Sequence, residues 1–317
     1  MVDLPRLGMG TAAIGNLYRS MTDAEADATV CAALDAGIRF FDTAPHYGFG
    51  LAEERLGRAL GARADVLVST KVGRLLVPTD DGRRERHGFV DARAYEPIFD
   101  YSSDAVLRSL DESLGRLGRE RVDMLLAHDI GELTHGAQHD ATLRTFLDQG
   151  YPAMRRLRDA GAVGAIGIGV NEVAVCLELL ARIEIDVILL AGRYTLLDRS
   201  AADALLPLCV AKGVRLIVGG PYNSGILAQP LADGGERRFD YAPAGAATLS
   251  RARTLEAALA RFGVPLPVAA LQFPLRHPAV ASVIPGMASP AEVADNVGRL
   301  AAIVPDDAWA ALEDVAA

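Results

Sequence analysis

Short apolar runs alternate with longer amphipathic stretches along almost the whole chain. Each run is apolar at consecutive positions and rich in Val, Ile or Leu, which is typical of strands buried on both faces of a parallel sheet. The stretches between the runs extend over roughly 10–15 residues and have helical periodicity. The predicted strands are Leu7–Ala13, Arg39–Asp42, Val66–Thr70, Val122–Ala127, Ala165–Gly169, Val187–Ala191, Arg215–Gly219 and Ser282–Ile284. The predicted helices are residues 23–36, 51–60, 103–117, 151–160, 172–182, 201–212, 250–262 and 290–302.

The ends of several predicted helices carry residues that favour such positions. Asp23 and Ser289 stand where N-caps are expected, because their side-chain oxygens accept hydrogen bonds from the first N–H groups of a helix. Glycine tolerates the left-handed conformation that often ends a helix. Glycines of this kind follow several of the stretches: Gly37, Gly61, Gly118, Gly161 and Gly213.

Eight strand–helix units in a chain of 317 residues predict a closed (β/α)8 barrel, one domain that covers residues 1–317. The alternative is a doubly wound open sheet, which usually has fewer strands and a Gly-x-Gly-x-x-Gly sequence after the first one. Gly8 and Gly10 are followed by Gly15, which does not fit that spacing. The longest connections, about 72–102, 128–150 and 220–249, leave the C-terminal strand ends, where a barrel of this type has its active site.

The composition narrows the class of protein further. With 50% hydrophobic and 23% charged residues the chain is globular, and no apolar run is long enough for a membrane span. The net charge of −9 argues against a nucleic-acid surface. No apolar signal segment opens the chain, and Cys31, Cys176 and Cys209 lie in apolar surroundings that favour buried free thiols. We therefore expect a cytoplasmic protein.

Lysine is rare in this chain. Among 32 basic residues only Lys71 and Lys212 are lysine, so arginine supplies the general positive charge. An amine, unlike a guanidinium, has a pKa that its surroundings can tune. Lys71 directly follows the third predicted strand, which makes it a candidate for chemistry.

Four polar residues follow three neighbouring predicted strands: Asp42, Tyr47, Lys71 and His128. A phenol with a pKa of about 10 is a poor base at neutral pH, but an adjacent ammonium favours its phenolate, and a carboxylate beside the lysine holds that ammonium in place. A histidine opposite can bind the same substrate oxygen. Singly, these residues have ordinary structural interpretations as a cap, a half-buried ring, a solvated amine and a hydrogen-bonding imidazole. Together at consecutive strand ends they predict proton transfer at a carbonyl or hydroxyl oxygen.

Several segments resemble the aldo-keto reductase superfamily, in order from residue 8 to about 302. They are residues 8–11, 41–48 with Glu53, 69–72, 123–129 and 284–286 with Asn296. The resemblance implies the same barrel and a catalytic tetrad of Asp42, Tyr47, Lys71 and His128. Residues 126–136, 190–197 and 221–227 resemble, within that superfamily, the branch of D-threo-aldose (L-fucose) 1-dehydrogenases and pyridoxal 4-dehydrogenases.

The resemblance also implies a nicotinamide dinucleotide extended across the barrel mouth. Asn171 matches the family's carboxamide-binding asparagine, and residues 221–225 match its pyrophosphate-binding loop. Ala191 and Gly219 depart from the family, in which many members have a glutamine and a stacking aromatic ring. The cofactor residues implied are Thr11, Asp42, Asn171, Asn223, Ser224, Gly225, Gly286, Met287, Glu292 and Asn296.

The adenosine end indicates NAD. Gly286 and Glu292 stand where relatives that prefer NADP have a lysine and an arginine. A carboxylate repels the 2′-phosphate of NADP but accepts a hydrogen bond from a free 2′-hydroxyl. The alternative interpretation of Glu292 is an exposed acid in the first turn of a helix, which the helix dipole favours.

The expected reaction is NAD-linked oxidation of an aldose at C1, with L-fucose or D-arabinose as substrates and a lactone as product. The alternatives are pyridoxal oxidation or another NAD-linked alcohol or aldehyde oxidation, and a non-catalytic NAD(H) sensor. We expect no partner other than the sugar, neither nucleic acid nor membrane, and a monomer or small homo-oligomer. His135 and His139 are four residues apart without a third ligand nearby, so no metal is expected. The expected substrate residues are His46, Tyr47, Tyr101, His128, Asp129 and Arg193, with Asn223 at the same rim.

Overall fold

A computed structural model describes residues 2–231 and 237–316 of the chain. Its main sheet has eight parallel strands in the order β1-β2-β3-β8-β9-β10-β11-β14. The strands are β1 (Met9–Gly10), β2 (Phe40–Asp42), β3 (Leu67–Val72), β8 (Val122–His128), β9 (Val163–Val170), β10 (Val187–Ala191), β11 (Arg215–Gly219) and β14 (Val280–Ile284).

The first and last strands close the sheet into a ring. The N–H of Gly8 donates to the carbonyl oxygen of Val283 at 2.9 Å, and the N–H of Gly10 donates to Pro285 at 3.0 Å. In return, the N–H of Val283 donates to the carbonyl oxygen of Arg6 at 2.9 Å. These bonds leave no exposed edge between β1 and β14, and the predicted (β/α)8 barrel is confirmed.

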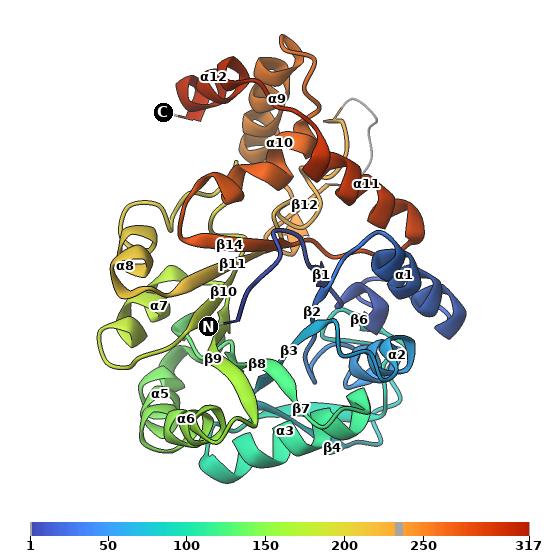
Figure 1. The fold of residues 1–317 in the computed structure, drawn as a ribbon, viewed down its shortest axis with the longest axis vertical. Helices are drawn as coiled ribbons and strands as arrows, with labels where there is room; N and C mark the ends of the chain where they lie inside the picture. Colours follow the sequence, from blue (N-terminus) through green and yellow to red (C-terminus); the bar gives the residue numbers. More distant parts are fainter. Residues whose placement is uncertain (1, 232–236, 317) are drawn as a thin grey trace.

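Helices surround the strands (Figure 1). None of those in residues 2–231 and 237–316 combines the length and apolar composition of a membrane-spanning segment. Helices α9, α10 and α12 lie together at one end of the view, with α12 packed on α9. The helices are α1 (Asp23–Asp35), α2 (Leu51–Leu60), α3 (Ser103–Leu117), α4 (Glu132–His135), α5 (His139–Thr145), α6 (Tyr151–Asp159), α7 (Val173–Leu180), α8 (Leu205–Lys212), α9 (Ala246–Ala260), α10 (Leu266–Gln272), α11 (Pro290–Ala301) and α12 (Asp306–Ala316).

Most predicted elements are present, with differences at some ends. Strand β1 is shorter than predicted because a 3-10 turn begins at Ala13. The N-cap of α1 is Thr22, not Asp23: its hydroxyl accepts from the N–H of Glu25, whose carboxylate binds the Thr22 N–H in return. Ser289 caps α11 as predicted. Helices α4, α5, α10 and α12 were not predicted.

The three long connections contain structure of their own. Residues 72–102 form two hairpins, in which β4 (Arg74–Pro78) pairs with β7 (Tyr95–Phe99) and β5 (Glu85–Arg86) pairs with β6 (Phe89–Val90). Residues 128–150 contain α4 and α5. In the connection 220–249, β12 (Arg238–Phe239) pairs with β13 (Ala242–Pro243), while residues 232–236 lie outside the described part.

The side chains inside the barrel change from apolar to ionisable towards the C-terminal strand ends. An apolar cluster takes alternate residues from neighbouring strands, among them Phe40, Met124, Leu126, Leu189 and Ile217, and the residues between them pack with the helices. Because the side-chain period of a strand is two, the next inward positions on β2, β3 and β8 belong to Asp42, Lys71 and His128.

Candidate active site

Lys71 lies at the centre of a buried hydrogen-bond network at the barrel mouth. Its side chain is 2% exposed, and its Nζ donates to Asp42 Oδ2 at 2.7 Å and to the Tyr47 hydroxyl at 3.0 Å. A third bond goes to the carbonyl oxygen of Thr43 at 2.9 Å. The other carboxylate oxygen of Asp42 accepts from the hydroxyl of Ser69 at 2.6 Å. All three ammonium protons therefore have acceptors.

This network keeps the lysine charged. Burial lowers the pKa of Lys71, but the Asp42 carboxylate, Tyr47 and the hydrogen bonds to both outweigh burial and raise that pKa above its ordinary value. The barrel mouth thus holds a permanent positive charge 3.0 Å from the Tyr47 oxygen.

Two opposing effects act on Tyr47. Burial raises the pKa of its phenol, and the Lys71 ammonium lowers it without cancelling the effect of burial. The effect expected of the ammonium is therefore present, and burial, which the sequence analysis did not consider, is the larger effect on this pKa. At neutral pH, Tyr47 is a neutral phenol whose ionisation Lys71 promotes.

His128 faces Tyr47 from β8. The two rings meet edge to face with centroids 5.9 Å apart. Two effects hold the pKa of His128 well below its ordinary value: burial, which is the larger, and the positive charge of Arg74. The imidazole is therefore neutral. Its Nδ1 is buried and has no partner among the described residues, whereas its Nε2 lies 3.5 Å from a carboxylate oxygen of Asp129. This arrangement favours the tautomer with the proton on Nε2, the nitrogen that can donate to a substrate oxygen.

The network opens into a cavity of about 640 Å³. Its walls come from the C-terminal ends of β1, β2, β3, β8, β9, β10 and β11 and from the residues that follow them. They include parts of all three long connections that the sequence analysis identified, 72–102, 128–150 and 220–249. Residues that line it include Tyr18, His46, Tyr47, Lys71, Arg74, Glu85, His87, Phe89, His128, Asp129, Asn171, Ala191, Arg238 and Tyr241.

The predicted substrate residues fall into two groups. His46, Tyr47, His128 and Asp129 line the cavity. Tyr101 does not: it is 2% exposed, and its hydroxyl donates to the backbone carbonyl of His128, so it supports the strand end.

Arg193 is also outside the cavity lining. Its guanidinium binds the backbone oxygen of Asn171 and the carboxylates of Asp198 and Asp240. It therefore connects two loops of the barrel mouth. Asn223, the other rim residue, is buried and binds Thr195 and the carbonyl oxygen of Gly192.

Sequence reasoning missed Arg74. It follows Lys71 by three residues, but it belongs to the hairpin strand β4, whose position cannot be read from periodicity. Its guanidinium contacts Asp129 and lies 3.1 Å from His46 Nε2. The only feature of the sequence that could have indicated its place in the site is that it lies three residues after Lys71.

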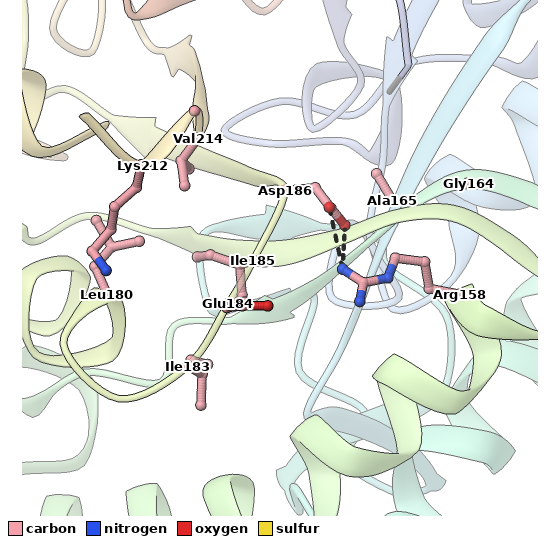
Figure 2. Close-up of a pocket in the computed structure, with 11 residues that line it drawn as sticks. Arg158, Gly164, Ala165, Leu180, Ile183, Glu184, Ile185, Asp186, Lys212 and Val214 are labelled. Carbon is pink, nitrogen blue, oxygen red and sulfur yellow. Dashed lines mark hydrogen bonds and ion pairs between the residues drawn. The ribbon is translucent and has the colours of Figure 1, made fainter. Parts of the chain in front are cut away.

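A second cavity, of about 570 Å³, lies at the opposite end of the barrel (Figure 2). It is lined by residues at the N-terminal ends of β9, β10 and β11, and it contains Lys212, the other lysine. Arg158 is paired there with Asp186 at 3.1 Å, while Lys212 lies apart from both. The N-terminal face of such a barrel contributes to stability, so we place the active site at the other cavity.

No metal site is visible. The described residues contain no group of three or more His, Cys, Asp or Glu side chains able to hold a metal ion. His135 lies 3.2 Å from the Tyr101 hydroxyl, and His139 lies 3.4 Å from a carboxylate oxygen of Glu178. The two histidines therefore have separate partners.

Comparison with known proteins agrees with this geometry. Residues 6–317 match the sequence profile described as the aldo/keto reductase family. The chain is 41% identical to pyridoxal 4-dehydrogenase of Microbacterium luteolum, over 96% of this chain and 92% of that protein. It is 38% identical to D-threo-aldose 1-dehydrogenase of a Pseudomonas species, over 98% and 94% respectively.

The chain belongs to the aldo/keto reductase family. The fold is also similar to a solved aldo-keto reductase from Bacillus halodurans in its holo form, with a TM-score of 0.76 and 26% identity over 98% of this chain and 91% of that one. Members of this family are oxidoreductases that generally use a nicotinamide cofactor.

The barrel mouth has room for a nicotinamide ring. Ala191 and Gly219 face each other on β10 and β11, and a Cβ added at Gly219 would lie 3.5 Å from that of Ala191. That Cβ would also lie 3.2 Å from Leu189 Cδ2, so the space at the mouth is the cavity that Ala191 and Asn171 line. Further along, a Cβ added at Gly225 or Gly286 would meet nothing within 4 Å. The residues present therefore fit the cofactor.

Other implied cofactor residues have structural partners as well. The Thr11 hydroxyl donates to the backbone oxygen of Asp42 at 2.9 Å. Ser224 Oγ accepts from the N–H of Tyr241 at 2.9 Å. Met287 is fully buried, and the Asn296 amide oxygen accepts from the Tyr222 hydroxyl at 2.6 Å.

Glu292 is exposed, and its carboxylate accepts from the backbone N–H of Ala288 at 2.8 Å. The carboxylate is therefore held at the loop formed by Gly286 and Met287. This position is compatible with a carboxylate that binds the 2′-hydroxyl of NAD and also with an exposed acid in the first turn of a helix. The described cations nearby are Arg19, whose guanidinium donates to the Ala288 carbonyl at 3.1 Å, and Arg299, which binds the Tyr222 hydroxyl.

Gly169 leaves the space that the Lys71 side chain occupies. A Cβ added at Gly169 would lie 3.1 Å from Lys71 Cε and 3.4 Å from Cδ. We expect Gly169→Ala to shift the Lys71 side chain by a few tenths of an ångström and to lower kcat by about 10-fold, less than the ~10²-fold cost of a misplacement on the order of 1 Å. Steady-state rates test this, with melting temperature as the measure of folding.

The matched control is Gly298→Ala on α11, where an added Cβ meets nothing within 4 Å and full activity is expected. If Gly169→Ala keeps the wild-type kcat, the placement of Lys71 does not depend on this gap.

Proposed function

We propose that the protein oxidises an aldose at C1 to the lactone with NAD, with L-fucose or D-arabinose among its best substrates. The observation that carries this proposal is the Asp42–Lys71–Tyr47 network opposite the neutral His128, at a cavity whose walls include several polar side chains. The names of the two relatives support a dehydrogenase. A cytoplasmic location fits the three free cysteines, although Cys31 is exposed and only Cys176 and Cys209 are buried as expected.

The chemistry of the proposal follows from the residues in place. Tyr47 and His128 hold the C1 oxygen of the sugar between them, the imidazole by donating from Nε2. As the C1 hydroxyl loses its proton, Tyr47 accepts it, and the fixed charge of Lys71 stabilises the phenolate that must form beforehand. Asp42 orients Lys71. The nicotinamide of bound NAD supplies the acceptor for the C1 hydride.

An intact network of this kind argues against a non-catalytic NAD(H) sensor. A sensor has to bind the cofactor, but it has no use for a phenol whose ionisation a buried ammonium promotes. We further propose a monomer or small homo-oligomer that acts without nucleic acid or membrane.

A second candidate is oxidation of pyridoxal. Many cavity residues carry rings, including Tyr18, His87, Phe89 and Tyr241, and a flat heteroaromatic substrate would pack well against them. Trp309, the single tryptophan, takes no part: it is buried in α12 with the Arg276 guanidinium 4.4 Å from its ring centroid.

The first prediction concerns the substrate. Initial rates of NADH formation should be highest with L-fucose or D-arabinose and should fall sharply for epimers at C2 or C3, because a missing hydrogen-bond partner leaves a buried polar group unpaired. The panel includes pyridoxal and simple alcohols. If pyridoxal is oxidised far faster than every aldose, the aldose proposal is wrong and pyridoxal oxidation takes its place.

The second prediction concerns Tyr47. We expect Tyr47→Phe to lower kcat by about 10²–10⁴-fold while NADH binding, followed by fluorescence, stays close to wild type. In the wild type, oxidation should become faster as the pH rises from neutrality, because burial holds the phenol pKa above its ordinary value and the phenolate accepts the proton.

The control for this variant is Tyr194→Phe, which removes a phenolic hydroxyl outside the cavity and should leave kcat unchanged. More than a few per cent of wild-type activity in Tyr47→Phe would mean that another group accepts the proton.

The third prediction concerns the cofactor. With one substrate, kcat/KM should be much higher for NAD than for NADP. Glu292→Gln keeps an acceptor for the Ala288 N–H but removes the charge, and it should raise kcat/KM for NADP by up to about fivefold, the effect of an exposed charge pair. Asp104→Asn, which changes another exposed acid in the first turn of a helix, α3, is the control and should change neither value. Equal or reversed cofactor preference in the wild type would contradict the NAD assignment.

A further inference from the structure

Arg74 and Asp129 form an ion pair inside the cavity, and the reaction proposed above does not use it. The side chains of the pair are 13% and 14% exposed. Both residues line the cavity, Arg74 from β4 and Asp129 from the position directly after β8. A buried ion pair contributes little net stability, because desolvation offsets the attraction of the charges. Its place in the substrate cavity therefore indicates a role other than stability.

The backbone of Asp129 places its carboxylate beside the reacting centre. Successive side chains of a strand point to opposite faces, so His128 and Asp129 would not normally share a cavity. Asp129 has a φ of 49°, in the left-handed region that aspartate tolerates better than most residues. This turn brings Asp129 Oδ2 to 3.5 Å from His128 Nε2. A substrate oxygen bound to that nitrogen has its neighbouring groups within reach of the carboxylate.

Arg74 is held from several sides before any substrate binds. One guanidinium nitrogen contacts Asp129 and another lies 3.1 Å from His46 Nε2. The guanidinium carbon also lies over the Phe99 ring, 4.9 Å from the ring centroid. Burial, and to a lesser extent the positive charge of Arg74, hold the pKa of His46 well below its ordinary value. The imidazole is therefore neutral and can accept a hydrogen bond from the guanidinium. The pair is preorganised.

Together the two side chains present an acceptor and donors side by side, with no net charge. A hydroxyl matches this arrangement because it can donate to the carboxylate and accept from the guanidinium at the same time. An anionic group at Arg74 either meets the negative charge of Asp129 or displaces it, and displacement leaves a buried carboxylate without its partner.

We propose that Arg74 and Asp129 are the specificity-determining pair of this enzyme, which binds a neutral hydroxyl on the carbon next to the one that reacts. The proposal rests on the proposed function, since it takes the C1 oxygen to lie between Tyr47 and His128. For an aldose, the hydroxyl selected is that on C2.

The test compares a neutral aldose with its 2-deoxy analogue and with its 2-O-sulfate, which carries an anion on C2. The wild type should favour the neutral aldose in kcat/KM over both, by roughly 10–100-fold, because the 2-deoxy sugar leaves the pair without its partner and the sulfate leaves the buried Asp129 carboxylate unpaired. Asp129→Asn keeps the shape but removes the charge. It should lower kcat/KM for the neutral aldose and narrow its ratio to the 2-O-sulfate at least tenfold, since Arg74 is then available to an anion.

The matched controls are Asp81→Asn and Arg83→Met. Asp81 and Arg83 form an exposed ion pair in the same connection, and neither lines the cavity, so both variants should keep the wild-type ratios. Arg74→Met should lower kcat/KM for the neutral aldose without any gain for the 2-O-sulfate. If that variant fails to bind NADH or melts early, Arg74→Lys, which keeps the charge but loses the planar fork, takes its place and should show the same direction.

The outcomes separate this proposal from the proposed function. An unchanged ratio in Asp129→Asn, or equal use of the 2-deoxy analogue by the wild type, overturns the role of the pair while aldose oxidation stands. If the wild type oxidises pyridoxal but no aldose, the proposed substrate is wrong. In that case the ratio of kcat/KM for pyridoxal to kcat/KM for pyridoxal 5′-phosphate is measured in the wild type and in the same variants. If Asp129→Asn does not narrow this ratio, the role of the pair is overturned. Oxidation of none of these compounds overturns both.

Discussion

A lysine ammonium buried at the mouth of an apolar barrel is the constraint on which the site depends. The charge is costly to remove from water, and it is tolerated here because each of its protons has an acceptor and one of them is the Asp42 carboxylate. Asp42 in turn accepts from Ser69. The result is a positive charge that cannot move away or be lost at neutral pH, next to the Tyr47 hydroxyl.

The barrel supplies this arrangement through its periodicity. Inward positions lie two residues apart along each strand, so the series that fills the lower barrel with apolar side chains ends in Asp42, Lys71 and His128 at the upper rim. Glycine at position 169 on β9 leaves the gap through which the lysine side chain reaches Tyr47. The site is therefore built mainly on rigid strands, and the long connections cover it.

The sequence predicted those features that depend on strand periodicity. Asp42, Lys71 and His128 follow apolar runs directly, and the parallel sheet brings the ends of those runs together. Arg74 was missed, and Tyr101 and Arg193 were placed in the cavity wrongly, because all three depend on how long connections fold. Spacing does not reveal that Tyr101 turns inward to the His128 backbone, nor that burial outweighs Lys71 in setting the pKa of Tyr47.

The central claim is that the fixed charge of Lys71 makes the buried phenol of Tyr47 ionisable. The most direct measurement is an NMR titration of protein labelled with 13C at the tyrosine ζ carbon, with the Tyr47 signal assigned by Tyr47→Phe and followed in the wild type and in Lys71→Met. If the account is right, Tyr47 ionises at a clearly higher pH in Lys71→Met, or does not ionise before unfolding, because only burial then acts on it. An equal or lower pKa of Tyr47 in Lys71→Met would contradict the account.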